Sequence, residues 1–113
     1  KDDKKVFLKN KDRFLNQFSN SKNNVVKLGL ITIYFDFLNH FEEKEVSKIK
    51  TIVLNWTKNS SDWMILAQGM KLLEKLSKSD KYLKLKLIEV AKRLKNDKRK
   101  VVRTKAQKIL EDN

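Results

Sequence analysis

A small residue recurs three times along this chain inside a helix-like pattern, at Gly29, Gly69 and Ala106. The same kinds of neighbours surround each copy, with a β-branched residue four positions before it and apolar or β-branched residues three and four positions after it: Val25, Thr32 and Ile33; Ile65, Leu72 and Leu73; Val102, Ile109 and Leu110. Spacings of 40 and 37 residues are typical of stacked helical repeats. Glycine costs about 1 kcal/mol inside a helix. Because both glycines of the chain fall at this position, we predict that helices approach each other closely there.

The residues that break helices are almost absent from this chain. Its 113 residues include no proline and only two glycines, whereas lysine, leucine and glutamate, which favour helices, are abundant. A chain of this length is enough for one domain with a modest core. We therefore predict an all-α fold with a single domain over residues 1–113.

Apolar residues recur every three or four positions and predict six helices. The expected helices cover residues 3–18, 25–41, 43–58, 63–77, 80–95 and 98–111, with the first burying Val6, Phe7, Phe14, Leu15 and Phe18. Short connections predict three antiparallel hairpins, at about 3–41, 43–77 and 80–111. The helix at 25–41 is apolar around most of its circumference, so we expect it to be the most buried.

Local signals place several helix ends and one further packing surface. Asp62, and Ser79 or Asp80, are expected to cap the helices that follow them. Acids in the first turn of the helix at 43–58 suit the helix dipole; these are Glu43 and Glu45, with Glu42 just before them. On the helix at 80–95, Leu85 and Ile88 form a second apolar strip among Lys81, Lys84, Lys92 and Lys95, which we expect to contact a neighbouring repeat.

The last predicted hairpin carries a recognisable motif. Asp97 is followed by Val102-Arg103 five and six residues later, and Ala106 and Leu110 follow at intervals of four. This segment resembles the second helix of a HEAT repeat, and residues 80–111 resemble the whole unit. The resemblance implies a right-handed α-solenoid of stacked hairpins. It also implies a structural role for Asp97 and Arg103, which in such repeats commonly bond between units.

Positive charge is concentrated in the last third of the chain. The formal net charge is +13, and residues 71–108 hold fifteen Lys and Arg against four acids. A compositional bias would explain lysine in place of arginine, but not the scarcity of acids in one segment. In HEAT-type stacks the second helices line the concave surface, where Lys71, Lys75, Lys100, Lys105 and Lys108 become candidate contacts to nucleic-acid phosphates. Lysines suit attraction to the backbone better than base recognition.

Catalytic and metal-binding motifs are missing from the sequence. There is no cysteine, the only histidine is His40, and no glycine-rich phosphate loop occurs. We therefore expect no catalytic residue, no metal and no cofactor. At helical spacing Trp56 is expected in the core, whereas Trp63, in a first turn beside Asp62, is a candidate for exposure. Known HEAT-like DNA glycosylases use Trp and Asp on a basic concave surface, which keeps such an enzyme as a third hypothesis.

The preferred function from sequence is a non-enzymatic binding module for DNA or RNA backbone. The second hypothesis is a protein-interaction scaffold that binds an acidic protein surface or stacks on further repeats. The charged start Lys1–Lys5 and the lack of a long apolar run predict a cytoplasmic chain that does not bind membranes. The chain does not begin with Met, which suits a piece of a longer repeat protein, and the pattern favours no particular oligomeric state.

Overall fold

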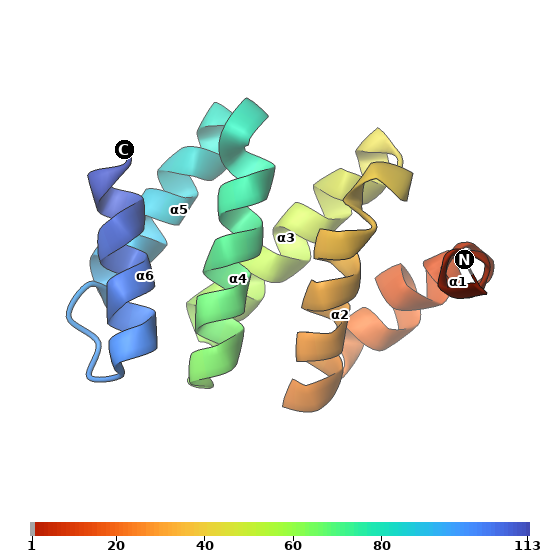
Figure 1. Ribbon diagram of the computed structural model, residues 1–113, viewed down its shortest axis with the longest axis horizontal. Coiled ribbons are helices and arrows are strands. Elements are labelled where there is room, and N and C mark those ends of the chain that lie inside the picture. The colour runs from red at the N-terminus through yellow and green to blue at the C-terminus, as the bar shows by residue number, and fades with distance from the viewer. Residues whose placement is uncertain (1) are drawn as a thin grey trace.

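The computed structural model describes residues 2–113, and side chains from residue 5 onward. Residues 2–113 form six α-helices and no strand (Figure 1), so the all-α prediction is confirmed. The helices are α1 (Asp2–Asp12), α2 (Asn24–Asp36), α3 (Glu43–Asn59), α4 (Trp63–Leu76), α5 (Lys81–Leu94) and α6 (Lys100–Glu111). A π-helical segment, Arg13–Gln17, and short 3-10 turns at Phe18–Asn20, Leu38–His40 and Ser77–Ser79 lie between them.

The helices lie in two layers. α2, α4 and α6 run side by side in the same direction, and α3 and α5 pass behind them (Figure 1). α4 contacts α2 on one side and α6 on the other, and it also packs on α3 and α5. The radius of gyration, 13.9 Å, is close to the roughly 13 Å expected for a compact domain of about 100 residues. Within the described chain, each helix is too short or too polar to cross a lipid bilayer.

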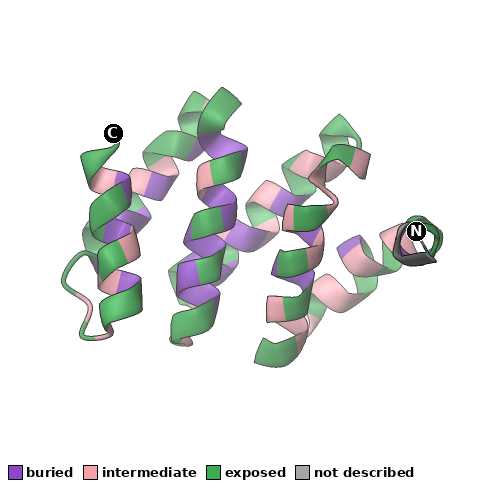
Figure 2. Cartoon of the chain, in the orientation of Figure 1, coloured by how far each residue is buried: buried purple, intermediate pink, exposed green. Residues whose placement is uncertain are grey.

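The core is centred on α4. Eight of its fourteen residues are buried (Figure 2): Ile65, Leu66, Ala67, Gly69, Met70, Leu72, Leu73 and Leu76. α2 buries only Leu30, Ile31 and Tyr34. The prediction that the helix at 25–41 is the most buried is therefore wrong. Apolar residues on most sides of α2 do not all find partners, because α4 lies between two helices of its layer and α2 has only one such neighbour.

The first two predicted helices end earlier than expected. Regular α-helix stops at Asp12, where the expected helix at 3–18 becomes the wider π-helical segment, and Val6 is 57% exposed instead of buried. α2 stops at Asp36 instead of Phe41, because the backbone of Phe37 leaves the helical region. This break lets the rings of Phe37 and Phe41 both contact Phe7, with centroids 4.4 and 5.1 Å from that ring.

Helix starts follow the local signals more closely. The Asp62 carboxylate accepts the backbone N–H groups of Met64 and Ile65, and the Asp80 carboxylate accepts that of Leu83, so the predicted caps are confirmed. α3 begins with a capping box between Glu42 and Glu45. α6 starts at Lys100 instead of Lys98, because residues 97–99 form a loop closed by side-chain bonds to Asp97.

The two glycines have different surroundings. A Cβ added at Gly69 would lie 2.5 Å from Cγ2 of Thr57 on α3, whereas a Cβ at Gly29 would meet no atom within 4 Å. The predicted close approach is therefore confirmed for Gly69 and wrong for Gly29 within this chain. Ala106, the third copy, is fully buried.

Candidate nucleic-acid interface

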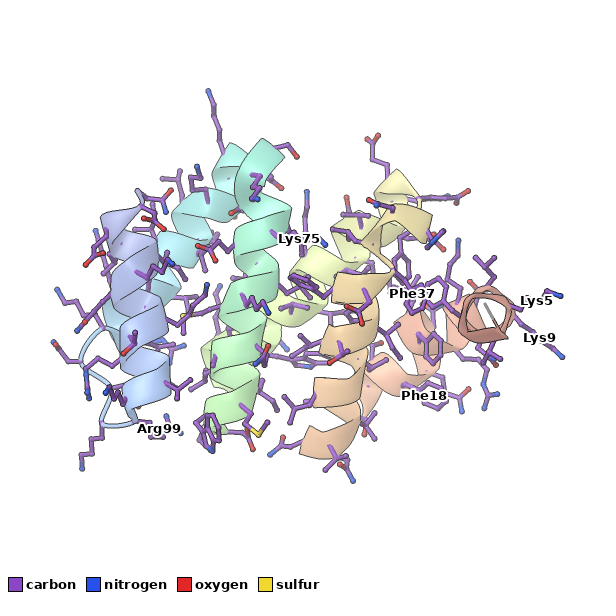
Figure 3. All side chains as sticks on the ribbon, in the orientation of Figure 1. Lys5, Lys9, Phe18, Phe37, Lys75 and Arg99 are labelled. Atoms are coloured by element: carbon purple, nitrogen blue, oxygen red, sulfur yellow. The ribbon has the colours of Figure 1, made fainter. Side chains whose placement is uncertain are left out.

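Bonds between neighbouring segments run along the edge where α2, α4 and α6 begin. The Arg99 guanidinium (labelled in Figure 3) bonds the Asp97 carboxylate through Nε at 2.9 Å and Nη2 at 3.0 Å, and its Nη1 donates to the carbonyl of Ser61 before α4. Asn24 of α2 in turn donates to the Asp62 carboxylate at 3.4 Å. These contacts connect the N-terminal ends of three helices that are far apart in sequence.

Arg103, the arginine of the HEAT-like motif, bonds locally instead. Its Nη1 donates to the carbonyl oxygens of Asp97 and Lys98, at 3.1 and 3.4 Å. The Arg99 guanidinium holds the pKa of the Asp97 carboxyl at about 2. The structural role of Asp97 therefore depends on Arg99, and Arg99 rather than Arg103 reaches the loop before α4. The sequence motif assigned the bonding role to Arg103, because only Arg103 has the spacing from Asp97 that the motif requires.

The five candidate phosphate-binding lysines do not all share one environment. Lys71 and Lys75 lie together on α4 beside Phe35 of α2, with Nζ 5.1 and 4.1 Å from the ring centroid. Lys75 Nζ also donates to the Phe35 carbonyl at 3.1 Å. Both lysines remain exposed, so they form a pair of cations at the C-terminal half of α4, where Lys75 is labelled in Figure 3.

The other three candidates lie on α6. The Lys105 ammonium pairs with the Glu74 carboxylate of α4 at 2.5 Å, so its charge is largely compensated within the protein. Lys100 and Lys108 are exposed at opposite ends of the helix, about 12 Å apart along its axis from the 1.5 Å rise per residue. The structure therefore places Lys108 toward the same end of the layer as Lys75, and Lys100 beside Arg99.

All four acids of the basic segment have a cationic partner. Glu74 pairs with Lys105, Asp80 with Lys50 of α3 at 2.8 Å, Asp97 with Arg99, and Glu89 with Lys86 at 3.9 Å. The bond from Lys50 is the main cause that lowers the pKa of the Asp80 carboxyl. Among these acids only Glu89 is exposed. Within residues 71–108 each acid is thus paired with a cation, whereas Glu111 and Asp112 at the end of α6 are exposed.

Eleven cationic residues of the same segment remain exposed: Lys71, Lys75, Lys78, Lys81, Lys84, Lys92, Arg93, Lys95, Lys98, Lys100 and Lys108. Four of them lie on α5, and Lys95 directly follows that helix. The alignment on the small-residue repeat did not predict these five cations as site residues, because it covered only the expected second helix of each hairpin. The charge count over residues 71–108 already contained them and was the signal that could have found them.

The apolar strip predicted on α5 is not covered by a neighbouring helix. Leu85 is 62% exposed, and Ile88 is half-buried. The expectation of a repeat contact is therefore wrong for Leu85. Tyr82, one turn earlier, is 69% exposed, with Lys86 Nζ 5.3 Å from its ring centroid. The outer side of α5 is consequently basic with an exposed apolar and an exposed aromatic side chain.

Trp56 and Trp63 also differ in environment. Trp56 is buried, as predicted, whereas Trp63 at the start of α4 is 44% exposed. The neighbouring Asp62 carboxylate accepts two backbone N–H groups of α4 through Oδ1, and the Asn24 amide through Oδ2. Asp62 thus acts as a helix cap that links two helices.

No protein-family model, curated protein or solved structure matches the chain. A proposal for the function of the chain therefore rests on its charges, contacts and exposed residues.

Proposed function

We propose that this chain is a non-enzymatic, HEAT-like helical-repeat module that binds the backbone of a nucleic acid through α4, α5 and α6. One observation carries the proposal: in residues 71–108 the acids are paired, and eleven cationic residues are exposed against a single exposed acid. Paired acids do not repel phosphates. The surplus of cations attracts a polyanion from several directions.

The architecture supports the repeat part of the proposal. In a HEAT-like solenoid of right-handed, stacked hairpins, α2, α4 and α6 are the second helices, and their side-by-side packing suits that role. Gly69 and Ala106 are buried at matching positions of α4 and α6. The cations that extend from Lys71 to Lys108 then span two successive hairpins, which gives phosphates of an extended strand several contacts.

Lysine dominates the exposed cations, and this determines the kind of binding we propose. A lysine ammonium attracts a phosphate as a point charge, whereas specific base contacts more often use the guanidinium fork of arginine. We expect affinity with little sequence preference and a steep dependence on salt. Exposed Tyr82 on α5 adds a ring on which an unpaired base can stack, which favours single strands.

The test measures binding of a fluorescent single-stranded RNA, the matching DNA strand and the DNA duplex by anisotropy, from about 50 to about 200 mM salt. We expect log K to fall linearly with log salt, and Lys71→Glu with Lys108→Glu to weaken binding. The slope for the duplex should shrink by about 0.9 for each phosphate that the variant no longer neutralises. Absence of binding at the lowest salt would end the proposal.

A matched control separates the surface from the net charge. Lys5→Glu with Lys9→Glu makes the same change in net charge at exposed positions of α1, at the other end of the molecule (Figure 3). We expect this variant to retain most of the affinity. Equal losses in both double variants would mean that binding reflects the overall charge alone, and the proposed interface would be wrong.

An acidic protein surface is the second candidate ligand for the same cations. Exposed Leu85 favours it, because an aliphatic side chain gains more from a protein partner than from a phosphate backbone. Leu85→Ser distinguishes the two. Binding of nucleic acid should be unchanged by this substitution, whereas a protein partner that buries Leu85 should bind more weakly.

A further inference from the structure

An apolar trough lies at the N-terminal end of the molecule, between α1 with its π-helical extension and α2. Two adjoining cavities of about 250 and 330 Å³ form it, and both are lined by Phe14 and Ile33. The first also contacts Phe18, Val26 and Gly29, and the second contacts Val6, Phe37 and the acidic Asp36. We call this surface the α1–α2 trough. It is separate from the basic half formed by α4, α5 and α6.

The π-helical segment shapes one wall of the trough. The wider turn at Arg13–Gln17 leaves Phe14 and Phe18 half-buried, with ring centroids 5.9 Å apart. The hydroxyl of buried Tyr34 donates to the Phe14 carbonyl at 2.9 Å, which fixes this turn against α2. π-helical turns occur frequently at functional sites. Here the turn leaves two aromatic rings at a surface that no other element of the described chain covers.

Gly29 lies on the side of α2 that forms the other wall of the trough. Val26, Gly29 and Ile33 follow one another at intervals of three or four residues, so they lie along one side of α2, and Phe37 directly follows the helix. No atom lies within 4 Å of the position that a Gly29 Cβ would take. The glycine therefore has the open space that a close helix contact needs. An extended apolar side of this kind, with a small residue in its middle, fits a helix laid into a groove.

The charges near the trough indicate what kind of helix fits. Lys5, Lys9 and Arg13 are exposed on α1 and its π-helical extension, and the Arg13 guanidinium lies 5.2 Å from the Phe18 ring centroid. Asp36 at the end of α2 is the one charged residue that lines the trough itself. Figure 3 shows Lys5 and Lys9 projecting outward at this end of the molecule. A second copy of the chain, with its own net charge of +13, would be repelled. Acidic side chains of a partner would be attracted on the side formed by α1 and its extension, where three cations face the one acid of α2.

We propose that the α1–α2 trough binds an amphipathic helix of a partner protein, whose apolar side enters the trough and whose polar side is acidic. The apolar side chains of the partner occupy the space above Gly29 and between Phe14 and Ile33. Its acids face Lys9 and Arg13. This binding is independent of nucleic-acid binding by the opposite end of the molecule.

The test uses three synthetic amphipathic peptides of about 18 residues, or five helical turns. The first has leucines on one side and glutamates on the other. The second replaces the glutamates with lysines, and the third keeps the glutamates but replaces the leucines with serines. We expect calorimetry to give micromolar affinity for the first peptide, and at least about tenfold weaker binding for the other two. Equal binding of the first and third peptides would reduce the interaction to charge and overturn the proposal.

Substitutions then locate the binding site. Gly29→Leu places a side chain in the trough whose Cβ meets no atom within 4 Å, and it replaces a helix glycine, so the protein should fold at least as stably. We expect it to weaken the acidic peptide at least about tenfold and to leave RNA binding unchanged. Thr104→Leu, at an exposed position of α6 away from the trough, is the matched control and should leave the affinity for the acidic peptide unchanged. Arg13→Glu should weaken the acidic peptide and strengthen the lysine peptide.

The remaining outcomes contradict the proposal. Full affinity of Gly29→Leu for the acidic peptide, or amide shifts on α5 and α6 instead of α1 and α2 in a two-dimensional NMR titration, would place the peptide elsewhere. Concentration-dependent dimerisation that Gly29→Leu abolishes would identify a second copy as the occupant of the trough. A change in RNA affinity in Gly29→Leu would show that the two surfaces are not independent.

Discussion

Gly69 and Gly29 occupy the same position in the repeated pattern, but only Gly69 is required by a close contact. Thr57, whose Cγ2 a Gly69 Cβ would approach to 2.5 Å, is fully buried, and its hydroxyl donates to the Leu54 carbonyl. Neither the backbone nor the methyl group can move without disturbing α3. Gly29 faces open space. The same residue type thus has a packing role in α4 and leaves room for a partner in α2.

Gly69→Ala should lower the free energy of unfolding by about 1 to 2 kcal/mol, because overpacking of about 1–3 kcal/mol exceeds the gain in helix propensity of up to about 1 kcal/mol. Gly29→Ala should raise it by up to about 1 kcal/mol. Denaturant unfolding measures both. Adding Thr57→Ser to Gly69→Ala removes the clashing methyl group and should recover part of the loss. A neutral or stabilising Gly69→Ala would mean that α3 and α4 separate easily.

Asp97 gives a pH dependence whose sign follows from its surroundings. Arg99 lowers the pKa of the folded Asp97 carboxyl to about 2, from an ordinary value of 3.8. The stabilisation is therefore fully present above the unfolded pKa, and it is lost as the pH falls through the folded one. Asp97→Asn should cost about 1 kcal/mol at neutral pH. The difference from the unchanged protein should narrow below about pH 4 and nearly vanish near pH 2. Chemical unfolding of both proteins across this pH range measures the difference in the free energy of unfolding. A difference that stays constant with pH would contradict the prediction.

At the scale of elements, α4 holds the two layers together. It contacts α2, α3, α5 and α6, and Leu72 and Leu73 are fully buried. Leu73→Ala should therefore destabilise the whole molecule by about 2–5 kcal/mol, with one cooperative transition. Leu110→Ala, at a half-buried position of α6, is the control and should cost much less. Circular dichroism and tryptophan fluorescence, followed together, would reveal separate transitions if α4 did not couple its neighbours.

Elements were predictable from the sequence where short-range chemistry determines them. Asp62 and Asp80 cap helices through bonds two or three residues away, so the sequence pattern was sufficient. The early end of α2 depends on Phe7, which lies thirty residues before Phe37, and this aromatic contact has no local signal. The π-helical turn at Arg13–Gln17 likewise follows from tertiary packing instead of from apolar spacing.

The candidate site was predictable to the same limited extent. Counting charges located the basic third of the chain, because net charge needs no structure. It did not reveal that Lys105 is compensated by Glu74, since the two residues lie 31 positions apart. It also did not reveal that Arg99 links the start of α6 to the loop before α4, because Arg99 bonds both its neighbour Asp97 and the distant Ser61 carbonyl.

At the scale of the whole molecule, a net charge of +13 spreads over a body of 41 × 29 × 23 Å. The screening length is about 30 Å at 0.01 M salt and about 8 Å at 0.15 M. At low salt, cations on opposite ends of the molecule therefore repel one another, and this self-repulsion destabilises the fold. Added salt screens this repulsion, and it also weakens the attraction within salt bridges. Partners within 4 Å of each other are screened less than distant charges, so the loss of repulsion is the larger effect.

The melting temperature should therefore rise by several degrees between about 0.01 and about 0.15 M sodium chloride. Replacing Lys81, Lys84 and Lys92 of α5 with glutamine removes three exposed cations that have no acid within salt-bridge distance among the described side chains. This variant should be more stable than the unchanged chain at low salt and should gain less from added salt. Calorimetry of both proteins across the series provides the measurement. A polyanion held by the basic half replaces this repulsion with attraction, so the same calorimetry should show a larger rise with RNA than with sodium chloride, and a smaller one for the glutamine variant. A melting temperature that falls with salt would instead mean that close ion pairs such as Lys50–Asp80 outweigh the repulsion.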